Sequence, residues 1–259
     1  MPAAASRQSP SRGSALRLSL LGGFDLTLGP DRLTPCTSVQ RMLVYLAVRG
    51  RGRPVQRKAV AQELWSQVPS DRAASSLRSA LWRLPRPDGR ELVRTTTSTL
   101  SLAPEVRVDL WAGQDRARAI SAGAEPPAER DGDPAADLTS DLLPDWDEEW
   151  LLVEQESYRQ TRLHALEDLC DRLRQGGRYL EALQAGLAAV QCEPLRESAH
   201  RRVVEVHLAE GNPSEALREY SSFRRLLAEE LGLPPSPAIR QLVLHLLGRP
   251  LDGRAAPPR

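Results

Sequence analysis

The stretch SDRAASSLRSALWRL, residues 70–84, decides how the N-terminal half of this chain folds. Its apolar residues recur at the spacing of one helix face: Ala74, Leu77, Leu81 and Leu84. This period predicts an amphipathic helix over about 71–84. We expect Ser70 or Asp71 to cap the helix, because short polar side chains satisfy the free backbone N–H groups there, and Pro85 to end it.

The opposite face of this helix combines arginines, short hydroxyl side chains and one tryptophan: Arg72, Ser75, Arg78, Ser79, Trp82 and Arg83. Short side chains let a helix approach the DNA major groove closely, and arginine can bond guanine with two hydrogen bonds or hold a phosphate. These six residues are therefore our candidates for major-groove contacts, with Arg78 as the best candidate for base readout. Taken alone, the same pattern also suits an ordinary solvated helix face.

The segments before this helix predict two strands and two further helices. Residues 16–28 alternate apolar and polar around Gly22-Gly23, which predicts two short strands joined by a tight turn. A helix is expected from Thr37 or Ser38, as N-cap, to Gly50, and a second over about 56–65. Their expected buried residues are Val39, Met42, Leu43 and Leu46 in the first and Val60, Leu64 and Trp65 in the second.

The segment after the 71–84 helix predicts a hairpin. ELVRTTTSTLSL, residues 91–102, is rich in β-branched residues and polar in its middle, so its tip is expected near Thr96–Ser98. Strands, three helices and a hairpin, in that order, are typical of a winged helix-turn-helix, and the order resembles the OmpR-like output domains. The expected phosphate and wing contacts, which position DNA without reading its sequence, are Arg41, Arg57, Lys58, Arg90, Arg94 and Thr97.

The 35 basic and 34 acidic residues of the 259-residue chain are strongly segregated. Residues 37–108 hold 13 basic and five acidic residues, a net charge of +8. Residues 123–150 carry −9, and the rest, from residue 151 on, is neutral. The basic segment indicates a polyanionic partner.

The C-terminal half contains an internal repeat of 34 residues. GRYLEAL, residues 177–183, aligns with GNPSEAL, residues 211–217, and the helical patterns before them also correspond. This period is that of tetratricopeptide repeats, in which stacked helix pairs commonly bind protein. Small residues at Ala182, Ala189 and Ala216 are expected to let paired helices approach closely. Structural packing alone would produce the same pattern.

The sequence carries no sign of an enzyme, a cofactor or a metal site. A Walker A loop, GxSxG, HExxH and a glycine-rich dinucleotide motif are all missing, so no catalytic, cofactor-binding or metal-ligating residue is assigned. The histidines lack partners at metal-ligand spacing and are interpreted as packing or rim residues: His164, His200, His207 and His245. Three scattered cysteines, no CxxC pair and no long apolar run favour a soluble protein of the reducing cytosol.

Several stretches together resemble the SARP family of actinobacterial activators, which join an OmpR-like winged helix to a bacterial transcriptional activation domain. The resemblance covers about residues 16–247. RPVQRKAVAQELW and SSLRSALWRL match the second and third helices of the winged domain. The activation domain is matched by LLPDWDEEWLLVEQESYRQTRLHALEDL (142–169), by the repeat segments GRYLEALQAGLAAVQCEPLRESAHR and VHLAEGNPSEALREY, and by the ending LGLPPSPAIRQL.

This resemblance implies a mainly α fold with a small β component: a winged helix-turn-helix followed by a tetratricopeptide-like helical domain. The expected organisation is a tail (1–15), the winged helix (16–108), a linker (109–141) that is acidic from 123, the activation domain (142–247) and a second tail (248–259). It also implies a non-enzymatic activator that binds direct repeats in double-stranded DNA near the promoter −35 element as a homodimer. Its further partner would be RNA polymerase, through the sigma subunit and the alpha C-terminal domain.

The resemblance further implies control of a secondary-metabolite gene cluster from the cytoplasm, at the nucleoid. Two alternatives remain open from the residues themselves. A repressor would make the same DNA contact, and a cytosolic repeat scaffold would use the basic module to bind an acidic protein.

Overall fold

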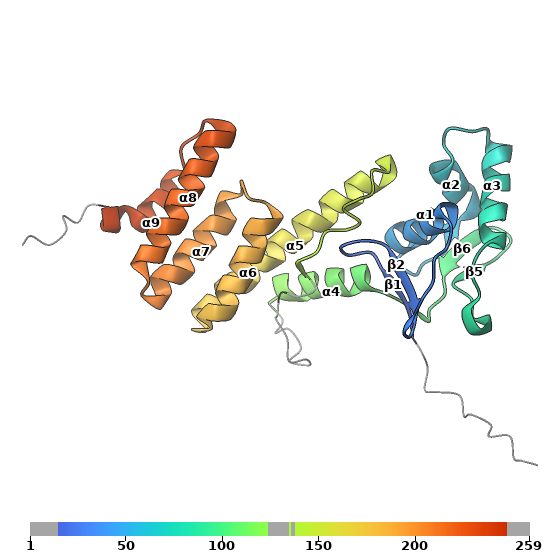
Figure 1. Ribbon diagram of the computed structural model, residues 1–259, viewed down its shortest axis with the longest axis horizontal. Coiled ribbons are helices and arrows are strands. Elements are labelled where there is room, and N and C mark those ends of the chain that lie inside the picture. The colour runs from blue at the N-terminus through green and yellow to red at the C-terminus, as the bar shows by residue number, and fades with distance from the viewer. Residues whose placement is uncertain (1–14, 124–134, 136–137, 248–259) are drawn as a thin grey trace, which may run out of the picture. The chain divides into compact units, whose positions relative to one another are not determined.

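The computed structural model describes residues 15–123, 135 and 138–247. The chain forms two compact units and passes between them three times. The first unit comprises Met1–Ala112 with Ser140–Glu156, and the second comprises Gly113–Thr139 with Ser157–Arg259. The expected fold class is confirmed, because small sheets near the N-terminus precede a helical C-terminal half (Figure 1).

The first unit begins with a four-stranded sheet in the order β3-β2-β1-β7. Its strands are β1 (Leu16–Ser19), β2 (Asp25–Leu28), β3 (Asp31–Arg32) and β7 (Val106–Val108). β1 pairs antiparallel with β2, as the alternating pattern predicted, and parallel with β7. The turn between β1 and β2 places Gly22 at φ +80°, a backbone conformation that glycine adopts without steric cost.

Three helices follow the first three strands. They are α1 (Thr37–Tyr45), α2 (Arg57–Leu64) and α3 (Ser70–Trp82), and a π-helical turn (Leu46–Gly50) extends α1. The residues expected to be buried in the first two helices are buried, except Trp65, which is half-buried. The expected N-cap of α1 was wrong: the helix begins one residue earlier, because the carbonyl of Cys36 accepts from the N–H groups of Val39 and Gln40.

A second, three-stranded sheet follows α3 in sequence and has the order β4-β6-β5. Its members are β4 (Val55–Gln56), β5 (Val93–Thr95) and β6 (Thr99–Leu102). β5 and β6 form the predicted hairpin, with residues 96–98 at its tip. The short strand β4 was not predicted, and it pairs with β6 directly before α2 begins.

Residues 140–156, here called the returning segment, complete the first unit. Leu143 donates its backbone N–H to the carbonyl of Leu20, 2.9 Å away, and the ring of Trp150 meets Tyr45 edge to face at 5.2 Å. We expected residues from 142 on to belong to the helical domain. Instead, the buried side chains of Leu142, Leu143 and Trp150 make this segment part of the first unit.

The second unit consists of helices. They are the later part of α4 (Asp109–Ser121), α5 (Glu149–Gln175) from residue 157 on, α6 (Tyr179–Cys192), α7 (Glu197–Glu210), α8 (Pro213–Leu231) and α9 (Pro237–Leu247). From α6 on, each helix packs against the next (Figure 1). α6 and α8, which follow the two aligned turns of the repeat, begin 34 residues apart, and Gly177 and Gly211 both have positive φ.

Two apolar cores hold these helices together. The larger core joins α4, α5, α6 and α7 and includes the small residues of α6: Ala182, Ala185 and Ala189. The other joins α7, α8 and α9 around Phe223 and Ile239. His200 is buried here as a packing residue, with its ring stacked on Phe223 and its Nδ1 atom 2.6 Å from Glu219.

The expected linker over 109–141 is in part helical, since α4 occupies residues 109–121. Most of the acidic stretch before residue 138 lies outside the described residues, as do the tails at 1–14 and 248–259.

Candidate nucleic-acid interface

α3 buries one face against α1 and α2. Its buried residues are Ala73, Leu77 and Ala80, while the predicted stripe members Ala74, Leu81 and Leu84 are half-buried. The buried face is therefore rotated slightly from the predicted one, because Ala73 and Ala80 accompany Leu77 in it. The expected caps were also wrong, since Pro69 is the N-cap and no side chain caps the helix.

The opposite face of α3 is exposed to solvent over its whole length. All six predicted major-groove candidates are exposed, and Trp82 has 87 % of its surface accessible. Among the described residues, no carboxylate lies within ion-pair distance of Arg72, Arg78 or Arg83. The face thus presents three guanidinium groups whose charges are not neutralised locally.

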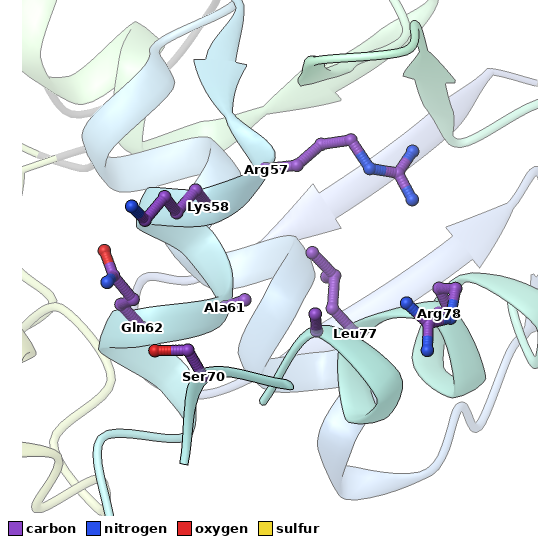
Figure 2. Close-up of a pocket in the computed structure, with 8 residues that line it drawn as sticks. Arg57, Lys58, Ala61, Gln62, Ser70, Leu77 and Arg78 are labelled. Atoms are coloured by element: carbon purple, nitrogen blue, oxygen red, sulfur yellow. The ribbon is translucent and has the colours of Figure 1, made fainter. Parts of the chain in front are cut away.

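A pocket of about 240 Å³ separates α3 from α2 (Figure 2). Arg57 and Lys58 extend from the start of α2, Arg78 extends from α3, and Ala61 and Leu77 supply apolar walls. Gln62 and Ser70, which were not among the predicted contacts, also line this pocket. Three cations around one concavity create a positive local field suited to a phosphate.

The wing, defined as β5, β6 and the tip residues 96–98, is attached to the start of α2. The backbone N–H of Arg57 donates to the carbonyl of Ser98 at 2.8 Å, and its Nη1 donates to the carbonyl of Thr96 at 3.3 Å. The Thr96 hydroxyl accepts the N–H of Thr99 at 2.9 Å, which closes the tip. Thr97 is exposed at its end. Arg57 therefore connects the wing to the pocket between the helices.

The remaining expected phosphate contacts differ in their surroundings. Arg41 is held by Glu148 of the returning segment through two contacts, Nε to Oε1 at 2.6 Å and Nη2 to Oε2 at 2.8 Å. This pairing occupies the guanidinium, so we do not retain Arg41 as a phosphate contact. Among the described residues, Arg94 makes a long, exposed ion pair with Glu105 at 3.4 Å, and Arg90 is exposed.

Cys36, which the sequence pattern did not single out, lies beside this face. The hydroxyl of Ser38, 3.4 Å from its Sγ atom, and the nearby guanidinium of Arg83 lower the pKa of this exposed thiol. Its position between the sheet and α1 gives no periodic signal, so only the folded chain brings it near α3. The pKa of Cys170, in the second unit, is shifted in the opposite direction, because burial raises it to about 12.

The described residues hold no group of three or more side chains that could bind a metal ion. Over the same ranges, no helix combines the length and the apolar character needed to cross a membrane.

Comparison with known proteins places this chain among bacterial regulators. The profile of the bacterial transcriptional activator domain matches residues 107–247. The regulatory protein AfsR of Streptomyces coelicolor is 30% identical over 244 residues, covering 90% of this chain and 24% of that protein. AfsR of Streptomyces griseus is 28% identical and covers 92% of this chain and 25% of its own length. This chain thus spans about a quarter of these relatives.

A smaller relative and a solved structure agree with this placement. The transcriptional regulatory protein MoaR1 of Mycobacterium tuberculosis is 25% identical, covering 92% of this chain and 81% of that protein. The solved structure of Mycobacterium tuberculosis EmbR in complex with a low-affinity phosphopeptide has the same fold, with a TM-score of 0.64 and 22% identity. The structural match covers 92% of this chain and 66% of the EmbR chain.

The expected resemblance to SARP-type regulators is thereby confirmed, and this is a family of transcriptional regulators rather than of enzymes. The chain belongs to the bacterial transcriptional activator domain family.

Proposed function

We propose that this protein is a sequence-specific DNA-binding transcriptional activator and that α3 enters the major groove. The observation that carries the proposal is the exposed face of α3, where Arg72, Arg78 and Arg83 have no acidic partner among the described residues. Uncompensated guanidinium groups interleaved with short hydroxyls favour a polyanion that the helix can approach closely.

Within this interface, some residues contact base edges and others contact the phosphate backbone. Arg78 contacts a base edge, and its neighbours on α3 complete the major-groove contact: Arg72, Ser75, Ser79, Trp82 and Arg83. Arg57 and Lys58 hold a phosphate at the pocket between α2 and α3. Arg90, Arg94 and Thr97 contact the backbone beside the wing. Phosphate contacts set position and orientation but carry no sequence information directly.

At the promoter, two copies of the chain occupy direct repeats near the −35 element and recruit RNA polymerase through the sigma subunit and the alpha C-terminal domain. The second unit, with its tetratricopeptide-like helix pairs, supports contacts between protomers and with the polymerase. The genes controlled belong to a secondary-metabolite cluster, such as one for an antibiotic, and the protein acts at the nucleoid in the cytoplasm. The family membership and the similarity to AfsR support these proposals.

A gel-shift titration with DNA from upstream of a neighbouring biosynthetic gene cluster tests DNA binding. We expect a retarded complex that random DNA of equal length does not compete away, and a footprint that covers two repeated half-sites. If cognate and random DNA compete equally, the sequence-specific interface is refuted. In that case the alternative of a scaffold that binds acidic proteins gains support.

In vitro transcription with purified RNA polymerase separates activation from repression. Addition of the protein should raise the yield of transcript from a promoter carrying the footprinted site. A promoter with scrambled repeats serves as the control. A fall in yield from the intact promoter alone would establish a repressor.

A further inference from the structure

A groove at the end of α8 carries three arginines beside an apolar wall. It has a volume of about 630 Å³ and lies where α8 turns into α9. Arg224 and Arg225 reach it from α8 and Arg240 from α9, while Leu233 and Pro234 form part of its wall. The sequence patterns did not predict this feature of the second unit.

The three arginines differ from the other arginines of the described second unit. Most of those are paired with a carboxylate, as in Arg178 with Glu181 at 3.0 Å and Arg218 with Glu215 at 2.8 Å. Within the described ranges, no carboxylate lies within ion-pair distance of the three groove arginines, and their side chains make one polar contact, from Arg225 to the Ser222 hydroxyl at 3.5 Å. The groove therefore concentrates positive charge that the fold leaves uncompensated.

The walls of the groove are held in place by the fold. Gly232, at φ +68°, ends α8 and lets the chain turn back. The carboxylate of Glu197 accepts the backbone N–H of Ser236 at 2.7 Å and also its hydroxyl. Ile239 is fully buried in the core between α7, α8 and α9. A groove with preset walls loses little conformational entropy when it binds a ligand.

Exposed apolar side chains accompany the charge at the groove and on α9. Leu233 has 55 % of its surface exposed, and Leu244, one helical turn after Arg240 on the same face of α9, has 63 % exposed. The acidic residues Glu229 and Glu230 are exposed at the end of α8. They would repel an anion from that side, so the favourable approach lies along the arginines.

We propose that this groove binds an acidic segment of a partner protein in which carboxylates flank an apolar side chain. Arginines from two helices match carboxylates that are spread along a chain, and each can form a bidentate pair. A single small anion would pair with the arginines but would not contact the exposed leucines or the proline wall. The site goes beyond the proposed DNA contact, because it lies in the second unit and involves none of the residues of α3.

Selection of random dodecapeptides displayed on phage against the full chain tests this proposal. We expect enrichment of sequences that combine several Asp or Glu residues with Leu, Phe or Trp. A synthetic enriched peptide, measured by fluorescence anisotropy, should bind the triple variant Arg224→Glu, Arg225→Glu, Arg240→Glu at least about tenfold more weakly. The milder variant Arg224→Gln, Arg240→Gln should show a smaller loss, which guards against misfolding of the reversal variant.

Arg218→Glu is the matched control, since Arg218 is an exposed arginine of the same helix outside the groove, and peptide affinity should not change. Gel shifts on the same variants measure DNA binding separately, and all of the variants should retain it. Enrichment without acidic residues, or equal affinity for the triple variant, would overturn the proposal. A loss of DNA affinity without any peptide binding would instead identify a nucleic-acid contact.

Discussion

Arg78 and Lys58 line the same pocket between α2 and α3, and neither has a carboxylate partner among the described residues. We nevertheless expect different consequences when each is removed. Arg78→Ala should cost roughly 1–3 kcal/mol on cognate DNA and relax specificity at one base step, because a base contact is lost. Lys58→Ala should weaken binding to all sequences alike, because a phosphate contact is lost. Gel-shift titrations on cognate DNA and on single-base variants measure both effects.

Arg218→Ala provides a control for the general effect of removing an exposed positive charge, since this residue lies in the second unit. Its affinity for both DNAs should match that of the unaltered protein. If Arg78→Ala lowers the affinity for cognate and random DNA equally, Arg78 contacts a phosphate and not a base.

Two cysteines should differ sharply in reactivity. The pKa of Cys36 is lowered by the Ser38 hydroxyl and Arg83, whereas burial raises the pKa of Cys170 to about 12. Because the thiolate is the reactive form, and its fraction rises as pH approaches the pKa, Cys36 should be alkylated well before Cys170 at about pH 8. Timed treatment with iodoacetamide followed by peptide mass spectrometry measures both rates.

The same experiment on the unfolded chain should label both cysteines at similar rates, since the difference arises from the fold. The variant Cys36→Ser should lose the fast phase. Early labelling of Cys170 in the folded protein would contradict the buried position of this thiol.

The exposure of single residues on α3 could be predicted from the sequence, but the helix caps could not. All six candidates lie on one side of a helix with 3.6 residues per turn, and that geometry is local. A cap depends instead on where the preceding backbone turns, and here Pro69 and Cys36 occupy the positions that polar side chains were expected to fill.

Among the helices, the contact of α6 with α5 and α7 depends on a glycine. A Cβ atom at Gly186 would lie 2.9 Å from Cγ2 of Val203 and 3.1 Å from Sγ of Cys170. We expect Gly186→Ala to lower the free energy of unfolding by about 1–3 kcal/mol, because the buried neighbours have no room to move apart without loss of packing. Thermal and urea unfolding of the full chain, followed by circular dichroism, measure this change.

Gly176→Ala is the matched control in the same unit. Its Cβ would meet the nearest atoms at 3.5 Å, an ordinary contact, so stability should be unchanged or slightly higher. Equal destabilisation by the two substitutions would refute close packing at Gly186 as the cause.

Most helices and strands could be predicted, because each has its own hydrophobic period and is bounded by turn residues. The repeat turns at Gly177 and Gly211 and the hairpin tip at 96–98 are local signals, and the structure confirms them. The strand β4 could not be predicted, since two residues carry no period and exist as a strand only through pairing with β6. α4 was missed because its residues lie at the start of the stretch 109–141, which was interpreted as a linker.

For the molecule as a whole, the net charge of +1 hides the property that governs DNA binding. If about six phosphates are contacted, affinity should fall on the order of 10³-fold or more between roughly 50 and 200 mM salt, because bound counterions are released. Gel shifts or anisotropy over a salt series give the slope of log affinity against log salt. Lys58→Ala should reduce that slope by about one.

A chain whose affinity hardly changes with salt would contradict an interface built on the basic residues of the first unit. The variant Arg224→Gln, Arg240→Gln of the second unit serves as an internal comparison, since it removes two positive charges without touching α3. Its slope should equal that of the unaltered protein.

The sequence by itself determined the fold class, the exposed basic face of α3, the wing hairpin and the 34-residue repeat. These follow from periods and turn residues that act over a few positions. Only the tertiary structure decided that Glu148 pairs with Arg41, that residues 140–156 belong to the first unit and that three arginines meet at the α8–α9 groove. Each of these joins residues distant in the chain or on different elements, and such contacts depend on packing in three dimensions that no local pattern encodes.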